Sequence, residues 1–415
     1  MTNLPPTIFV LGTDRDIGKT VTCIGLISNL LGPDCGYRPE EIGYMKPVGQ
    51  QVVQVHEVHS DSVEIAADKD AVLVTQLLGI ECDRYGDMSP IGWERGLSES
   101  LIDGAADGSL AKSRQELIER IQAAYRRIAR NKRIVLVEGT GQPGVGSVGG
   151  ISNPDVIRVL LEMGASVFVV LVAEGGIGST IDQVFPYLMA LDHLGTHVDG
   201  LIINNVLASK MDKVSRYVSG YYREVFPQFY GHLVRQGSPP GILGFVPEIS
   251  ELRLPTFRQV TEYLQSKTGT VELVTDCAWE DGSGDLPLVR NAKVISLDFG
   301  YEPYLSPGDV VIVGVNANDV ILAMLLLHER MMRTQGKGLS GLVLSCKQAG
   351  GLDTEIRELV RARSLPTITV ELDSADIVQR LDNATWKIQP YDELKRRLIA
   401  DAYRKHLTLW PELRA

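Results

Sequence analysis

The chain has 415 residues, of which 44% are hydrophobic and 22% charged, and its formal net charge is −11. This length favours two domains, and the composition is that of a globular protein without an apolar run long enough to span a bilayer. The acidic balance provides no basic face for nucleic acid or a membrane surface, so we expect neither partner. The first residues lack a basic segment followed by an apolar one, which predicts no secretory signal and a cytoplasmic location.

The motif that says most about function occupies residues 12–20 and has the sequence Gly-Thr-Asp-Arg-Asp-Ile-Gly-Lys-Thr. It lies between the apolar run 7–11 and an apolar helical pattern, which is the strand, loop and helix context of a phosphate-binding loop. The N–H groups of such a loop point into one concavity, and the helix start adds a positive dipole. We therefore predict a nucleoside triphosphate site in which Lys19 reaches the outer phosphates and the Thr20 hydroxyl binds Mg²⁺. The residues expected to contact the nucleotide here are Thr13, Asp14, Arg15, Asp16, Ile17, Gly18, Lys19, Thr20 and Val21.

The spacing of this loop indicates a family. Because five residues separate Gly12 from Gly18, the loop fits G-x-x-x-x-G-K-[ST] only with Thr13 at the first glycine position. The stretch resembles the loop G-T-D-T-x-V-G-K-T of dethiobiotin synthetase and its relatives, with Arg15 replacing the second threonine and Ile17 replacing the valine. The resemblance implies an α/β fold, a P-loop NTPase domain with a mainly parallel sheet flanked by helices, that binds ATP and Mg²⁺.

A second candidate residue, Lys46, follows a predicted buried strand that ends at Pro47. In open parallel sheets ligands bind at the carboxyl ends of the strands, so Lys46 is expected to face the phosphates. The stretch also resembles dethiobiotin synthetase, in which a lysine of a K-P-V turn lies by the reacting carboxylate and the γ-phosphate; this implies a catalytic role for Lys46. That family has a small hydroxyl residue two positions past Val48, where this chain has Gln50, so the acceptor substrate stays open.

Acidic residues complete the predicted site. Residues 68–79 begin with charges and continue with helical apolar spacing, so Asp70 falls near a helix start, where an acidic residue is commonly a cap. In the resembled family an aspartate at the head of this helix binds Mg²⁺. Asp70, followed by an alanine and an aliphatic residue, is the best match, and Asp68 is the alternative.

Glu138 is the third acid of the predicted site. The strand pattern at 133–137 delivers this glutamate to the same sheet edge, where a carboxylate after an aliphatic run resembles a Walker B acid. A carboxylate buried at that depth without a cation would be costly. We expect Glu138 to complete the magnesium site with Thr20 and Asp70, and to act in catalysis with Lys19 and Lys46.

Between these acids, residues 84–108 are rich in Gly, Ser, Asp and Pro and are predicted to form a long loop over the site. Ser113 is predicted to cap the next helix, with Glu116 completing a capping box. The buried stripe of that helix is predicted to consist of Leu117, Ile121, Ala124 and Ile128.

The later part of the first domain is predicted to recognise the base of the nucleotide. The stretch 142–153 is glycine-rich and, with Glu-Gly-Gly-Ile-Gly at 174–178, resembles the dethiobiotin-synthetase-like domain at the front of long phosphotransacetylases. Asn204 lies at the end of a strand pattern where this class reads the base, and its amide suits the edge of adenine. Residues 241–248, which include Pro247, resemble the last nucleotide-side strand and loop of the family.

A second α/β unit is predicted after Gly269, which sets the domains at 1–268 and 269–415. This half resembles the DRTGG domain that accompanies the first domain in phosphotransacetylases, although the Thr-Gly-Gly motif from which that domain takes its name is not preserved here. Its strands are expected at 293–298, 310–315, 341–346 and 367–371, and its helices are expected to start near Asn318, Thr354 and Asp392.

Two functions are compatible with these residues. In one, the chain is an ATP-dependent ligase-type enzyme in which Lys19, Lys46 and Mg²⁺ stabilise charge as a carboxylate or carbamate attacks the γ-phosphate. In the other, the same pocket makes an ATP-binding sensor or slow regulatory ATPase whose state passes to the second domain or to a partner. A protein partner or a small regulatory ligand is then expected at the second domain. Gln50, the changed stretch after Glu138 and the added domain favour the sensor.

Two further expectations come from the resemblance. The acetyl-transfer chemistry of phosphotransacetylases lies in a large C-terminal domain that is not expected here, so this chain is not expected to be a phosphate acetyltransferase by itself. The resembled enzymes pair subunits across the nucleotide domain, which makes a homodimer the default expectation.

Overall fold

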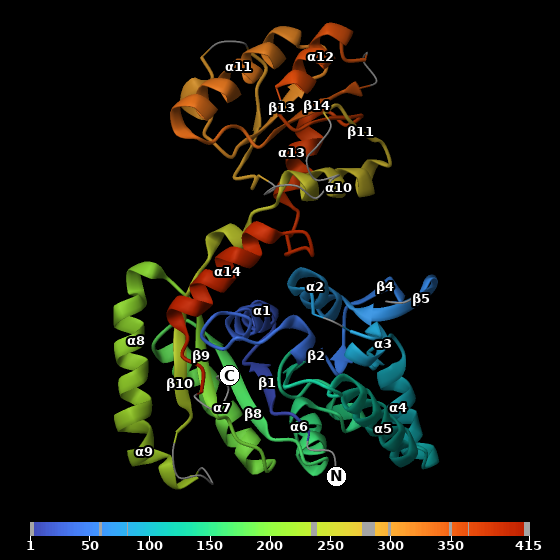
Figure 1. Cartoon of the computed structure of the whole chain (residues 1–415), viewed down its shortest axis with the longest axis vertical. Helices are drawn as coiled ribbons and strands as arrows, with labels where there is room; N and C mark the ends of the chain where they lie inside the picture. Colours follow the sequence, from blue (N-terminus) through green and yellow to red (C-terminus); the bar gives the residue numbers. More distant parts are fainter. Residues whose placement is uncertain are drawn as a thin grey trace. The chain divides into compact units, whose positions relative to one another are not determined.

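The structure, a computed structural model, describes residues 4–57, 60–80, 82–233, 239–275, 287–297, 300–347, 351–363 and 365–410 (Figure 1). It divides the chain into two compact units. The first consists of Met1–Ile249 together with Arg396–Ala415, and the second consists of Ser250–Lys395. Among the described residues, none of the helices combines the length and apolar character that crossing a membrane requires.

The first unit contains a six-stranded sheet in the order β10-β9-β8-β1-β7-β2, and every pair in it is parallel. All six residues of β1 are buried, which is typical of a parallel strand that is covered on both faces. This confirms the predicted P-loop type of fold. The strands are β1 (Thr7–Gly12), β2 (Ile42–Met45), β7 (Ile134–Glu138), β8 (Val167–Glu174), β9 (Gly200–Val206) and β10 (Gly241–Pro247).

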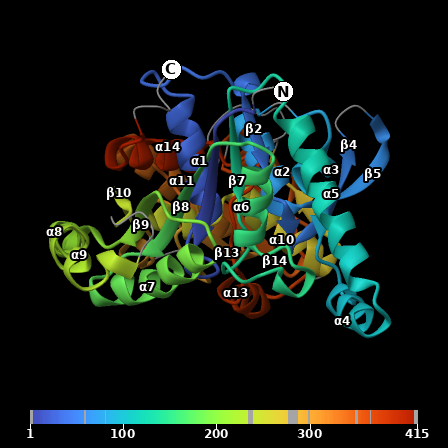
Figure 2. The same ribbon diagram turned by 90° about the horizontal axis from the view of Figure 1, so that it is seen from below.

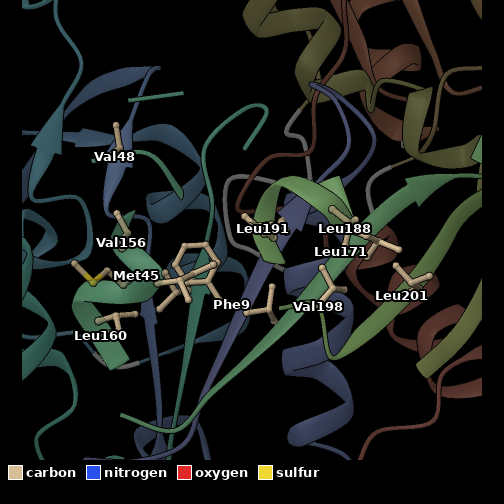
Figure 3. Close-up of a cluster of buried hydrophobic side chains, with 14 of the residues drawn as sticks. Phe9, Met45, Val48, Val156, Leu160, Leu171, Leu188, Leu191, Val198 and Leu201 are labelled. Atoms are coloured by element: carbon tan, nitrogen blue, oxygen red, sulfur yellow. The ribbon is translucent and has the colours of Figure 1, made fainter. Parts of the chain in front are cut away.

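Helices cover both faces of this sheet. Phe9 and Leu11 of β1 belong to one buried cluster, while the alternate residues Ile8 and Val10 are also fully buried. In Figure 3, Phe9 and Leu171 of the sheet lie near side chains from α6 and α7, among them Val156, Leu160, Leu188 and Leu191. The larger helices are α1 (Lys19–Leu30), α2 (Lys69–Leu78), α5 (Leu110–Ile128), α6 (Asn153–Glu162), α7 (Gly178–His193), α8 (Met211–Gly220) and α14 (Glu393–His406).

The predicted long loop at 84–108 is wrong, because this stretch contains α3 (Tyr85–Met88), β6 (Ile91–Gly92) and α4 (Leu97–Asp107). Two of its glycines stand at the two ends of a helix, Gly96 before its first residue and Gly108 after its last. Gly96 and Gly108 flank α4 with φ of 89° and 83°, a left-handed conformation that glycine adopts without a steric penalty.

The following helix, α5, begins at Leu110 with Ser109 at its N-cap position, so the predicted cap at Ser113 and its capping box with Glu116 are wrong. Its predicted buried positions are confirmed for Leu117, Ile121 and Ala124, and Ile128 is partly buried against the same cluster.

A hairpin that the sequence did not predict precedes α2. It pairs β4 (Val52–Glu57) with β5 (Ser60–Asp68) in antiparallel register, and it follows β3 (Val48–Gly49), which pairs with β6. The last residue of β5 is Asp68, which also caps α2. The hairpin therefore delivers an acidic residue to the start of that helix.

The second unit has a five-stranded sheet in the order β11-β15-β14-β13-β12, in which only the β11–β15 pair is antiparallel. The strands predicted at 310–315, 341–346 and 367–371 and the helix starts near Asn318, Thr354 and Asp392 are confirmed. The strand predicted at 293–298 is shorter, since β12 ends at Val294 and residue 298 lies outside the described residues, and β11 and α13 were not predicted. Its strands are β11 (Val271–Leu273), β12 (Ala292–Val294), β13 (Val310–Gly314), β14 (Gly341–Ser345) and β15 (Thr367–Val370), and its helices are α10 (Phe257–Thr268), α11 (Asn318–Gln335), α12 (Thr354–Ala362) and α13 (Ser374–Asp382).

The division into units differs from the predicted boundary after residue 268. Phe257, Val260 and Leu264 of α10 are buried in a cluster with strand residues of the second sheet, so α10 belongs to the second unit. The C-terminal residues from Arg396 return to the first unit, where α14 lies beside α1 (Figures 1 and 2).

Candidate nucleotide site

The phosphate-binding loop connects β1 to α1. Thr13 is anchored on the neighbouring strand because its N–H donates to Val172 O at 3.0 Å. The residues at 14–16 are exposed, Ile17 is buried, and Gly18 has φ of 93°. A Cβ at Gly18 would lie 2.4 Å from Asn204 Nδ2, so only glycine fits at this position. The predicted loop and its helix start are therefore present.

Lys19, the first residue of α1, is buried, and its ammonium donates to Asp14 O at 2.7 Å. This bond folds the lysine side chain back along the inside of the loop. Burial lowers the pKa of Lys19, and the charge of Glu138 opposes that effect. A phosphate at the same concavity would give this ammonium a charged partner.

Glu138 lies at the end of β7 and is almost fully buried. Its Oε1 accepts a hydrogen bond from the Thr20 hydroxyl at 2.9 Å, and its Oε2 accepts one from the Tyr44 hydroxyl at 2.6 Å. Burial raises the pKa of Glu138, Lys46 opposes that effect, and Asp70 adds to it. Thr20 and Glu138, which are both expected to hold Mg²⁺, therefore lie within hydrogen-bond distance of each other.

Lys46 is buried among three carboxylates. Its ammonium lies 3.0 Å from Asp68 Oδ1 and 3.5 Å from Glu138 Oε1, and it also contacts Asp70 Oδ2. Burial opposes the charged form, but these three carboxylates together raise the pKa of Lys46 above its ordinary value. Lys46 therefore stays protonated at the carboxyl edge of the sheet, as an ion that is held beside the loop.

The two candidate aspartates have different surroundings. The Asp68 side chain is completely buried, and it accepts the N–H groups of Asp70 at 2.9 Å, Gln50 at 3.0 Å and Gln51 at 3.2 Å. The Asp70 side chain is 27% exposed, and the partner recorded for its carboxylate is Lys46. Asp70 has more acceptor capacity left for a ligand, while Asp68 fixes the backbone around it.

The glycine-rich stretch after Glu138 is held by a residue that the sequence did not single out. Asn153 Oδ1 accepts the N–H of Thr140 at 3.0 Å, and its Nδ2 donates to Thr140 O at 3.0 Å and Gln142 O at 3.1 Å. Gln142 in turn donates to Asp14 Oδ1 at 3.0 Å. The loop after β7 is therefore joined to the phosphate loop.

Asn204, in β9, contacts the phosphate loop directly. It is 3% exposed, and its Nδ2 donates to Ile17 O at 2.9 Å. Pro247 lies at the carboxyl end of β10 and pairs in register with Val206 of β9, one strand outward from Asn204. Val21 lies in the first turn of α1 and is half-buried.

The chemistry of these side chains suits Mg²⁺. Within the described ranges, no group of three or more His, Cys, Asp or Glu side chains is arranged to hold a metal ion. Thr20, Asp70 and Glu138 offer one hydroxyl and two carboxylates. Magnesium is commonly held by one or two carboxylates, with phosphate oxygens and water completing its shell, so this set fits a nucleotide-bound ion.

Family models and a curated relative match parts of this chain. A family described as an AAA domain matches residues 6–256, and the DRTGG domain matches residues 300–384. A cobyric acid synthase from Rhizorhabdus wittichii is 26% identical over 228 residues, which cover 52% of this chain and 43% of that relative. The chain thus spans less than half of the length of the curated relative that it matches. Because the first match covers more than half of the chain, the protein belongs to this AAA-domain family of P-loop proteins, and it carries a DRTGG domain in its second half.

Proposed function

We propose that the protein binds Mg·ATP in its first unit and acts as an ATP-dependent sensor or slow regulatory ATPase, with the DRTGG domain as its regulatory part. The observation that carries this proposal is the arrangement at the sheet edge, where Lys46 contacts Asp70 and lies 3.5 Å from Glu138, which in turn accepts from Thr20. The Lys46 ammonium, which can bind phosphate, and the side-chain oxygens of Thr20, Asp70 and Glu138, which can bind Mg²⁺, lie together next to the phosphate-binding loop.

Each residue has a distinct role in this proposal. The N–H groups of the loop and the helix start bind the phosphates, and Lys19 exchanges its bond to Asp14 O for a phosphate oxygen. Thr20, Asp70 and Glu138 hold the magnesium ion, which would neutralise charge on the outer phosphates. With Asp70 and Glu138 engaged by the ion, Lys46 would keep Asp68 as its partner, and its ammonium would supply positive charge to the γ-phosphate.

The sensor is favoured over a ligase by what surrounds this cluster. Gln50 occupies the place of the small hydroxyl residue expected beside an acceptor, and its N–H is used to bind Asp68. Phosphoryl transfer at Lys46 would not require the second domain, whereas a sensor would use it as its regulatory part. An adenine nucleotide, a homodimer, and a protein or small-molecule partner at the second domain remain parts of the proposal.

The alternative is an ATP-dependent carboxylase or ligase that activates a carboxylate or carbamate by γ-phosphoryl transfer. The partial similarity to a protein named cobyric acid synthase favours keeping it. The same lysines would stabilise the charge of that transfer.

One experiment tests the sensor against a ligase that uses the substrates of dethiobiotin synthetase. The purified full chain is titrated with ATP in the presence of Mg²⁺, and turnover is followed with and without diaminopelargonate plus bicarbonate. We expect saturable Mg·ATP binding and a turnover that the added compounds leave unchanged. Formation of a carboxylated or cyclised product would overturn the sensor, and the absence of nucleotide binding would overturn both functions.

A further inference from the structure

The C-terminal segment Arg396–Trp410 is built into the first unit. Leu407 forms an antiparallel bridge with Gly244 of β10, and the N–H of Thr408 donates to Leu243 O at 2.9 Å. Farther along, the ring of Trp410 packs on Phe168 with their centroids 5.3 Å apart. The segment therefore adds to the edge of the sheet that holds the phosphate loop.

Tyr403, in α14, places its ring directly on α1. The side chain is completely buried, and a Cβ at Gly25 would lie only 2.2 Å from Tyr403 Cγ. A glycine inside a helix costs about 0.5–1 kcal/mol relative to alanine, so Gly25 is explained by the space that this ring needs. Asn29 of the same helix donates to Tyr403 O at 3.2 Å, which fixes the backbone of α14 there.

The hydroxyl of Tyr403 joins two parts of the nucleotide site. It is 2.8 Å from Thr22 Oγ1, two residues after the predicted magnesium ligand Thr20, and it donates to Asn204 Oδ1 at 3.4 Å. Asn204 in turn donates to Ile17 O in the loop. Burial raises the pKa of the Tyr403 phenol, so its proton is retained for these bonds.

We propose that Tyr403 is a positioning residue for the nucleotide, which orients the Asn204 amide so that Ile17 and Gly18 keep the conformation that binds phosphate. The inference rests on the proposed function, because it concerns the same loop. The inference goes beyond the proposed function because it gives a role to a residue near the end of the chain. Tyr403 lies in α14, and the first residues of this helix, up to Lys395, belong to the second unit. The same helix therefore continues from that unit to Tyr403, which is linked to the loop by hydrogen bonds through Asn204.

The test compares Tyr403→Phe with a matched control, Tyr125→Phe. Tyr125 is equally buried, and its hydroxyl is 2.6 Å from Thr7 Oγ1 at the start of β1, away from the loop that follows Gly12. Each variant keeps its ring and loses a buried tyrosine–threonine hydrogen bond. We expect both variants to lose stability in denaturant, since each loses a buried hydrogen bond to a threonine, and Tyr403→Phe also loses the longer bond to Asn204.

Nucleotide binding should separate the two variants. Tyr403→Phe should weaken ATP binding by about fivefold, which corresponds to one ordinary hydrogen bond, and Tyr125→Phe by less than about twofold. Because Tyr403 acts on the loop and not on the metal ligands, the loss should be the same with and without Mg²⁺. In an Asn204→Ala background, Tyr403→Phe should have little additional effect.

Binding by Tyr403→Phe with wild-type affinity, or an equal weakening by both variants, would overturn the positioning role while leaving the proposed function intact. A wild-type chain that does not bind ATP would instead overturn the proposed function. Gly25→Ala provides a second route, because it forces the ring away from α1 without changing any polar group. A folded Gly25→Ala variant with unchanged ATP affinity would also count against the proposal.

Discussion

The hydroxyl of Thr20 donates to Glu138 Oε1 at 2.9 Å and so joins the first turn of α1 to the carboxyl end of β7. A magnesium ion held by both oxygens would replace this hydrogen bond with two metal contacts. Under the proposed function, the closeness of these two groups would reduce the ordering cost of binding the ion.

The first prediction concerns Lys19. We expect Lys19→Ala to reduce Mg·ATP affinity by at least about tenfold, because a charge-assisted hydrogen bond to phosphate is lost. Stability without nucleotide should change little, since the ammonium is buried with a carbonyl oxygen as the partner recorded in the structure. Lys112→Ala, at an exposed position of α5, serves as the control in the same titration. Unchanged affinity in Lys19→Ala would remove the phosphate-loop assignment.

The second prediction separates the two aspartates. Asp68→Asn should lower the free energy of unfolding by about 1–3 kcal/mol, because its buried carboxylate accepts three backbone N–H groups and faces Lys46. Asp70→Asn should leave stability nearly unchanged and weaken ATP binding only when Mg²⁺ is present. Denaturant unfolding and titrations with and without Mg²⁺ provide the two measurements. A magnesium-specific loss in Asp68→Asn alone would make Asp68 the ligand.

The third prediction concerns the pH dependence of stability through Glu138. Its pKa is raised in the folded state, so between the ordinary value of 4.5 and that raised pKa the folded chain binds more protons than the unfolded chain. Stability without nucleotide should therefore fall as the pH rises through this window. Glu138→Gln removes this contribution, so the variant should gain stability relative to wild type at pH 8 compared with pH 5. Unfolding curves at both pH values test it, and a relative gain at the lower pH would contradict it.

The fourth prediction concerns the choice of base. Asn204 gives one N–H to Ile17 and accepts from Tyr403, which leaves one amide N–H and one oxygen lone pair for adenine. We expect ATP to bind roughly tenfold more tightly than GTP, with Asn204→Ala reducing the preference. Competition against a labelled ATP analogue measures both. Equal displacement by GTP would restrict Asn204 to supporting the loop.

The parts of the site that follow local patterns were predictable from the sequence. Strand, loop and helix succeed one another between Thr7 and Leu30, and the apolar runs before Lys46 and Glu138 mark where parallel strands end. Since such strands end at one sheet edge, the approximate meeting of these side chains could be predicted. Their pairing could not, because a linear pattern does not reveal that Lys46 is placed among three carboxylates.

The missed residues depend on contacts between distant segments. Tyr403 and Thr22 are 381 positions apart, and Tyr44 and Glu138 are 94 apart, so no local periodicity marks either pair. Helix α4 was missed for a different reason. The glycines at its two ends are typical of both loops and helix caps, and only the packing of Leu101 against the neighbouring helix decides between them.

The discontinuous first unit has a consequence for how the chain folds during its synthesis. The strands of its sheet are complete at Pro247, but the segment that pairs with Gly244 is made only after the whole second unit. Until then the outer edge of β10 presents unpaired N–H and C=O groups, which readily associate with strands of other chains. The interval between these two stretches of synthesis is therefore a period in which this edge is open to association with other chains, and slow translation there would lengthen it.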